Sequence, residues 1–302
     1  MFDFPVWLIL ALASPLCWAI VHILDSYCVK NVFTQPWVGT ATSSLTMLAL
    51  LPFWCLGFLF ADLKGVTPDI VVECVLAGAV FVISQATYFQ ALAKSEPGIV
   101  AAYWNLLPVI LLVSSFFWTG QRLSSESYLG SLILVGSSVT FCLVDTNSSY
   151  RWTTFCLMFV GSWLQAIYFW LIEHIFRQCA VFPAFITIMV SMIVFGFIPL
   201  LFRPGRKEMS LNCPRIKSAL VFLILIEVAN LLAVASSQYA VEAGPAPLVA
   251  TVEASLPAFT LGLSVLLYLS FGKFGDPKSF EHISTKLSLT LLMLIGIWLI
   301  SR

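Results

Sequence analysis

Charged residues are scarce in this sequence. Only 10% of its 302 residues are Asp, Glu, Lys or Arg, whereas a typical soluble domain has about 25%. Hydrophobic residues make up 60% of the chain, and its mean hydropathy is +0.97. A soluble protein of this size needs a larger polar surface, so most of the chain must have lipid as its solvent. The composition therefore excludes a soluble globular domain and predicts a multi-pass integral membrane protein, expected in the cell (inner or plasma) membrane.

The sequence also lacks the patterns of several functional classes. Its 15 basic and 15 acidic residues balance, so no charge excess indicates a nucleic-acid partner. The eight cysteines form no CxxC pair and the histidines are not paired, so neither a disulfide framework, a metal site nor a cofactor is expected. There is no GxSxG, no HExxH and no pair of catalytic aspartates, which argues against an intramembrane enzyme. A receptor or scaffold would more often carry a soluble domain or long tails.

Ten apolar stretches are each long enough to cross a bilayer, which takes about 20 residues of helix. They are separated by charged residues and by Pro and Gly clusters, and the loops between them are short. The predicted fold is therefore all-α and integral to the membrane, with ten transmembrane helices. The predicted spans are 5–28, 37–60, 70–93, 99–118, 126–144, 152–174, 182–202, 218–240, 246–270 and 286–301.

The two halves of the chain resemble each other. The stretch "FQALAKSEPGIVAAYWNLLPVI" (89–110) aligns with "SQYAVEAGPAPLVATVEASLPAFT" (237–260), and Pro108 then meets Pro257. This alignment also makes Trp104 and Glu253 equivalent positions.

Each half holds five predicted helices, an odd number, so the second copy must be inverted in the membrane relative to the first. The halves are expected at 1–147 and 148–302, as two repeats of one membrane domain around a central cavity. Inverted repeats with a site at their interface are the architecture of secondary transporters that work by alternating access. A monomer already supplies both halves of such a pathway.

The positive-inside rule orients these spans. The loops that follow odd-numbered spans carry 11 of the 15 Lys and Arg residues, and the opposite side carries four. The count places both termini outside the cytoplasm.

Polar and aromatic residues recur at helical spacing inside several spans and indicate a common cavity. A carboxylate at the centre of a membrane helix costs about 2–3 kcal/mol, so it marks a functional site by default. The alternative is that it pairs structurally with a buried Asn, His or Gln. The candidate substrate- and proton-binding residues are Glu253, Glu227, Trp104, Trp18, His22, Asp25, Asn230, Gln238, Tyr88 and Gln165. Three prolines remove a backbone hydrogen bond each and are expected to kink their helices: Pro15, Pro108 and Pro257.

Three segments resemble a known family. They are "ASPLCWAIVHIL" (13–24), "YFQALAKSEPGIVAAYWNLLPVI" (88–110) and "TGQRLSSESYLGSLILVGSSV" (119–139). Together with the repeated junction of the second half, they resemble the EamA-like branch of the drug/metabolite transporter superfamily, end to end. The resemblance implies transport of amino acids, metabolites, drugs or nucleotide sugars. Gln121 stands where that family often has Glu, and Asp25 stands near where many members have a cation, so roles do not transfer to these two positions.

The distribution of charged residues limits the classes of substrate that the protein is expected to transport. No Lys or Arg lies in the middle third of any predicted span, whereas a phosphate or nucleotide-sugar site would need one. Aromatic rings beside a carboxylate suit a cation. The predicted function is a secondary transporter that exchanges a small cationic or zwitterionic metabolite for protons at Glu253, an antiport. The alternative is an uncoupled exporter or facilitator of neutral or zwitterionic amino acids or related metabolites, in which the acids are structural.

Overall fold

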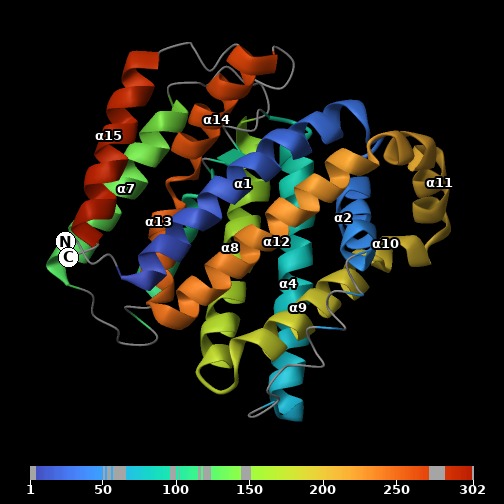
Figure 1. The fold of residues 1–302 in the computed structure, drawn as a ribbon, viewed down its shortest axis with the longest axis horizontal. Coiled ribbons are helices and arrows are strands. Elements are labelled where there is room, and N and C mark those ends of the chain that lie inside the picture. Colours follow the sequence, from blue (N-terminus) through green and yellow to red (C-terminus); the bar gives the residue numbers. More distant parts are fainter. Residues whose placement is uncertain are drawn as a thin grey trace.

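The structure is a computed structural model, and it describes residues 5–49, 52, 56, 66–95, 100–101, 103–114, 117, 124–143, 151–271 and 283–300. Within these residues the chain is all-helical and contains no strand, which confirms the predicted class. The helices form one bundle in which long helices cross at its centre (Figure 1).

Seven helical segments of the described chain are long and apolar enough to cross a membrane. Each coincides with one of the predicted spans. They are α1 (Val6–Asn31), α4 (Pro68–Leu92), α8 (Arg151–Phe176), α9 (Val181–Gly196) with α10 (Ile198–Leu201), α12 (Leu220–Ala243), α13 (Ala246–Glu253) with α14 (Leu256–Phe271), and α15 (Ile283–Ile300).

Three further described helices lie in the other three predicted spans. They are α2 (Trp37–Ala49), α6 (Leu106–Ser114) and α7 (Ser125–Leu143). The spans predicted over 37–60 and 99–118 extend beyond the described residues, so the total of ten spans stays a prediction.

The start of α4 shows how local sequence sets a helix end. Thr67 is in an extended conformation, and its hydroxyl accepts a hydrogen bond from the backbone N–H of Ile70. Pro68 follows in the first turn, where its missing N–H has no cost, and Asp69 places a negative charge at the positive end of the helix dipole. The capping residues thus begin the helix close to the predicted residue 70.

One predicted loop is wrong. The segment between the seventh and eighth predicted spans is largely a helix, α11 (Arg203–Ser218), which packs on α2, α10 and α12. Its buried Asn212 donates a hydrogen bond to the Thr34 hydroxyl at 2.7 Å and accepts one from the Thr34 backbone N–H at 2.9 Å. A search for long apolar runs misses such a helix because its residues are mostly polar. Five of the 11 basic residues in the orientation count lie on α11, and Lys286 is buried in the first turn of α15.

The central helices pack in pairs that join the two halves of the chain. The pairs are α1 with α12, α4 with α8, and α7 with α15. Figure 1 shows α7 and α15 side by side at one edge of the bundle, with α1 and α12 crossing its middle.

Two glycines permit the close contact of α7 with α15. A Cβ atom added to Gly130 would lie 2.7 Å from the Gly296 carbonyl oxygen, and one added to Gly296 would lie 2.8 Å from the Gly130 carbonyl oxygen. Backbones meet here because neither residue has a side chain, as at other small-residue contacts in membranes.

We therefore predict that Gly130→Ala destabilises the protein by about 1–3 kcal/mol, the usual cost of overpacking a tight contact. Gly136→Ala, in the same helix, is the matched control because an added Cβ meets no described atom within 4 Å. Thermal unfolding in detergent, followed by tryptophan fluorescence, measures both. An equal effect of the two substitutions would contradict this account of the helix pair.

Candidate functional site

Two membrane helices are interrupted near the centre of the bundle. The span predicted over 246–270 divides into α13 and α14, with a turn at Ala254 and Ser255. Pro257, the second residue of α14, has no N–H to donate to the carbonyl of Glu253 four residues earlier. The expected kink is therefore a complete break, and it lies immediately after Glu253.

The first half contains the corresponding interruption. Trp104 and Asn105 form a turn before α6, and Pro108 lies in the first turn of that helix. The Trp104 carbonyl, which Pro108 cannot pair, accepts instead from the Leu107 N–H at 2.9 Å. By contrast, α1 continues as a single helix through Pro15.

The two breaks border a cavity with a water-accessible volume of about 70 Å³, here called the main cavity. At about 10–15 Å³ for each water, it has room for several waters or a small organic molecule. Its wall comes from α1, α4, α6, α8, α12, α13 and α14 and from both turns. The lining residues are Trp18, His22, Phe81, Gln85, Tyr88, Trp104, Asn105, Leu107, Gln165, Tyr168, Phe169, Val234, Ser237, Ala250, Glu253, Ala254 and Leu256.

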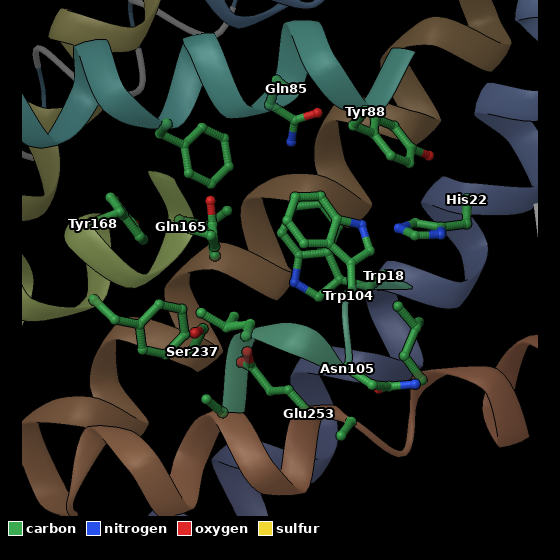
Figure 2. Close-up of a pocket in the computed structure, with 17 residues that line it drawn as sticks. Trp18, His22, Gln85, Tyr88, Trp104, Asn105, Gln165, Tyr168, Ser237 and Glu253 are labelled. Carbon is green, nitrogen blue, oxygen red and sulfur yellow. The ribbon is translucent and has the colours of Figure 1, made fainter. Parts of the chain in front are cut away.

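Aromatic rings form one side of the main cavity. The ring of Tyr88 lies 4.9 Å from that of His22 and 6.3 Å from that of Trp104, measured between centroids. Trp18 meets His22 edge-on at 6.4 Å. Figure 2 shows the indoles of Trp18 and Trp104 projecting to the middle of the cavity, between Gln85 and Tyr88 on one side and Glu253 on the other.

Glu253 is the acid of the main cavity. Its side chain is half-buried and points into the cavity, with Ser237 beside it (Figure 2). The hydroxyls of Ser237 and Ser14 approach the carboxylate, but its buried Oε1 atom has no hydrogen-bond partner among the described residues. No lysine or arginine is among the described residues of the lining. The carboxylate therefore lacks a countercharge there.

The other predicted acids lie elsewhere. Asp25, Glu227 and Asn230 line a smaller cavity of about 40 Å³, here called the second cavity, which shares Phe81 and Gln85 with the main one. The predicted site residues are thus divided between two adjoining cavities instead of one.

Glu227 differs from Glu253 in being well bonded. Its Oε2 atom accepts hydrogen bonds from Ser43 at 2.8 Å and from Thr46 at 3.4 Å, and its Oε1 atom accepts one from Asn230 at 3.0 Å. Asp25 accepts a hydrogen bond from the Tyr88 hydroxyl at 3.2 Å. This last bond joins the cavities, because Asp25 lines the second and Tyr88 the main one.

Gln238 lies behind the wall and not in it. It is fully buried and donates a 2.6 Å hydrogen bond to the hydroxyl of Tyr168, which does line the main cavity. Sequence reasoning missed Tyr168, although the residue lies three positions after Gln165 and therefore on the same helix face. It also missed Phe81, which is apolar, and Ser237, although Ser237 lies seven positions after Asn230 and therefore on the same helix face.

A profile of the EamA-like transporter family matches residues 5–142. These residues belong to the EamA-like transporter family. The family lies within the drug/metabolite transporter superfamily, as the motifs of the first half indicated. The chain has the apolar helices of a multi-pass membrane protein, and its first half matches a transporter family. The match stops before the second half, so the end-to-end resemblance is confirmed only for the EamA-like first half.

The fold extends over the whole chain. Among 28 matching chains of solved structures, one is 13% identical, with 95% of both chains covered and a TM-score of 0.60. At this identity the likeness shows the fold alone. No curated protein matches the sequence.

The Tyr168–Gln238 bond yields a stability prediction. Tyr168→Phe removes the acceptor of a buried amide donor, so it should lower the free energy of unfolding by about 1–3 kcal/mol. Adding Gln238→Leu should recover part of this loss, because removing both partners leaves no unpaired donor. Tyr239→Phe is the matched control for loss of a hydroxyl. Additive losses from Tyr168→Phe and Gln238→Leu in thermal unfolding would show that the bond contributes no coupling.

Proposed function

We propose that this transporter exchanges a small cationic or zwitterionic metabolite for protons at Glu253, by alternating access. One observation carries the proposal: a carboxylate without a described countercharge faces a cavity walled by aromatic rings, at the break between α13 and α14. Broken helices that line a cavity are a recurrent form of transporter binding site.

The wall of the main cavity favours a positively charged group. Trp18 and Trp104 present their rings opposite Glu253 (Figure 2), and an aromatic face attracts a desolvated cation with about 2 kcal/mol. The amides of Gln85 and Gln165 line the same space and supply donors for the carboxylate of a zwitterion. The small volume supports a compound of metabolite size.

Proton exchange follows from the requirement for neutrality. An ionised carboxylate without a countercharge is very unfavourable in apolar surroundings. Glu253 is therefore neutralised in one of two ways, by a bound proton or by the positive group of the substrate. If only these two forms complete the conformational change, uptake of one ligand requires release of the other, which is antiport.

The pairing of helices supports an inverted repeat with halves at 1–147 and 148–302. The contact of α1 with α12 has its counterpart in that of α8 with α4, and the contact of α4 with α9 has its counterpart in that of α12 with α2. Trp104 and Glu253, equivalent in the sequence alignment, both stand at helix breaks and both line the main cavity. In the proposed cycle the halves rock about the α7–α15 pair.

The proposal predicts proton release on binding. Cationic metabolites added to the purified protein in weak buffer at about pH 7 should release protons in a saturable manner, since they displace the proton of Glu253. Glu253→Gln should abolish the release because an amide holds no such proton. A pH indicator dye measures it directly, beside thermal stabilisation as a separate signal of binding.

Two other carboxylates provide controls. Glu227→Gln should keep proton release at saturating compound because Glu227 lies outside the main cavity, and Glu242→Gln should behave as wild type because Glu242 is exposed at the end of α12. If Glu227→Gln lost proton release and Glu253→Gln retained it, the exchange would occur at Glu227 and the assignment to Glu253 would be wrong. Stabilisation without any proton release would instead support the uncoupled transporter.

The aromatic wall gives a further prediction. Trp18→Leu should weaken binding of a cationic compound about 2- to 30-fold, the range that corresponds to a cation–π contribution. Trp163→Leu is the control, because Trp163 is 38% exposed on α8 and does not line the main cavity. Titrations followed by thermal shift compare the two. Equal affinities in both variants would argue against a cation at the Trp18 ring.

A further inference from the structure

The second cavity is rich in oxygen atoms. Two carboxylates line it, those of Asp25 and Glu227, which are 6% and 2% exposed. Serine and threonine hydroxyls of α2 lie opposite them: Thr40, Ser43, Ser44 and Thr46. No lysine, arginine or histidine is among the described residues of this lining.

Two oxygens in this cavity lack partners within the described chain. They are Oγ1 of Thr40 and Oδ1 of Asn230, both on side chains that are only 6% exposed. The amide of Asn230 is oriented by its hydrogen bond to Glu227, because only the Nδ2 group can donate to a carboxylate. Its Oδ1 atom, an acceptor only, is thereby left for a ligand.

We propose that the second cavity binds a monovalent cation of about sodium size. Carboxylate, amide and hydroxyl oxygens are the ligands of hard cations. A cation between Asp25 and Glu227 offsets the repulsion between two acids that interact electrostatically. It also satisfies Oδ1 of Asn230 and Oγ1 of Thr40, which no donor among the described residues reaches.

The number of oxygen atoms available as ligands in the second cavity favours a monovalent over a divalent ion. Calcium takes six to eight oxygens, whereas both oxygens of Glu227 already accept hydrogen bonds from three side chains. Among the described residues, no group of three or more His, Cys, Asp or Glu is close enough to hold a metal ion. A singly charged ion balances one of the two carboxylates, so in the proposed complex the other carboxyl group carries a proton.

The ion site has a direct connection to the main cavity. Asp25 accepts the hydrogen bond of Tyr88, and the Tyr88 ring lies against His22 and Trp104 in the aromatic wall. A cation that keeps Asp25 ionised strengthens this bond and holds the wall in place. Cation and substrate should therefore raise each other's affinity, since coupling is reciprocal. This coupling rests on the proposed function, whereas cation binding itself does not.

The experiment compares ions at constant ionic strength. The purified protein is kept in N-methylglucamine chloride, and this salt is replaced stepwise by NaCl, KCl or LiCl. Thermal unfolding and tryptophan fluorescence are measured at each step. We expect a saturable rise of the unfolding temperature with sodium, because the ion binds only the folded protein. No cation-specific change, or a response to pH alone, would overturn the proposal.

Thr40→Val is the most informative variant. It removes one proposed ligand and no hydrogen bond of the described protein, so it should fold and yet weaken sodium about ten-fold or more. Thr42→Val is the matched control, because the Thr42 hydroxyl bonds the Val38 carbonyl within α2 and does not line the cavity. Asp25→Asn should abolish the response. Equal sodium affinities in Thr40→Val, Thr42→Val and wild type would overturn the assigned site.

Glu253→Gln separates this proposal from the proposed function. It should keep the sodium response unchanged while losing proton release, because Glu253 lies in the other cavity. If sodium binding persists and no substrate-linked proton release occurs in the wild type, only the proposed function fails. If the sodium response disappears in Glu253→Gln, the ion binds in the main cavity and the present assignment is wrong.

Discussion

The structure depends on one constraint: inside a bilayer, backbone polar groups must be satisfied by the protein or face a cavity. The long described helices meet it with their internal hydrogen bonds, and a proline within a helix withholds one such N–H. Pro108 and Pro257 do so at corresponding points of the two halves, and the helices break there. The breaks bring Trp104 and Glu253 to the main cavity, so this cavity lies where the backbone of two membrane helices is irregular.

The two central glutamates have different surroundings, and this difference organises the polar interior. Glu227 accepts three hydrogen bonds in a cavity of hydroxyls and amides. Glu253 faces aromatic rings and keeps an oxygen without a described partner. The surroundings of Glu227 suit a bound ion shared with Asp25. The surroundings of Glu253 suit exchange between a proton and an organic cation. The Asp25–Tyr88 hydrogen bond joins the linings of the two cavities, and the proposed coupling between the two sites acts through it.

Helix packing supplies the frame for this arrangement. Each central pair joins the two halves of the chain, and in the α7–α15 pair the backbones approach closely because Gly130 and Gly296 face each other. In the proposed transport cycle, movement of one half against the other preserves that contact while the walls of the cavities separate. The basic helix α11 stands apart from this core, held by the reciprocal hydrogen bonds of Asn212 with Thr34.

Composition and apolar run length alone determined the membrane class, the all-α fold and the position of seven spans, because a bilayer imposes a length on every helix that crosses it. The motifs of the first half also determined its family. Only the tertiary structure decided which polar residues meet. Helical spacing shows on which face of a helix a residue lies, but it does not show which other helix that face contacts. It could therefore not place Glu227 and Glu253 in different cavities. Nor could it reveal that Gln238, behind the cavity wall, donates a hydrogen bond to Tyr168. The helix α11 was missed for a related reason, since its burial comes from contacts with other helices and not from its own hydrophobicity.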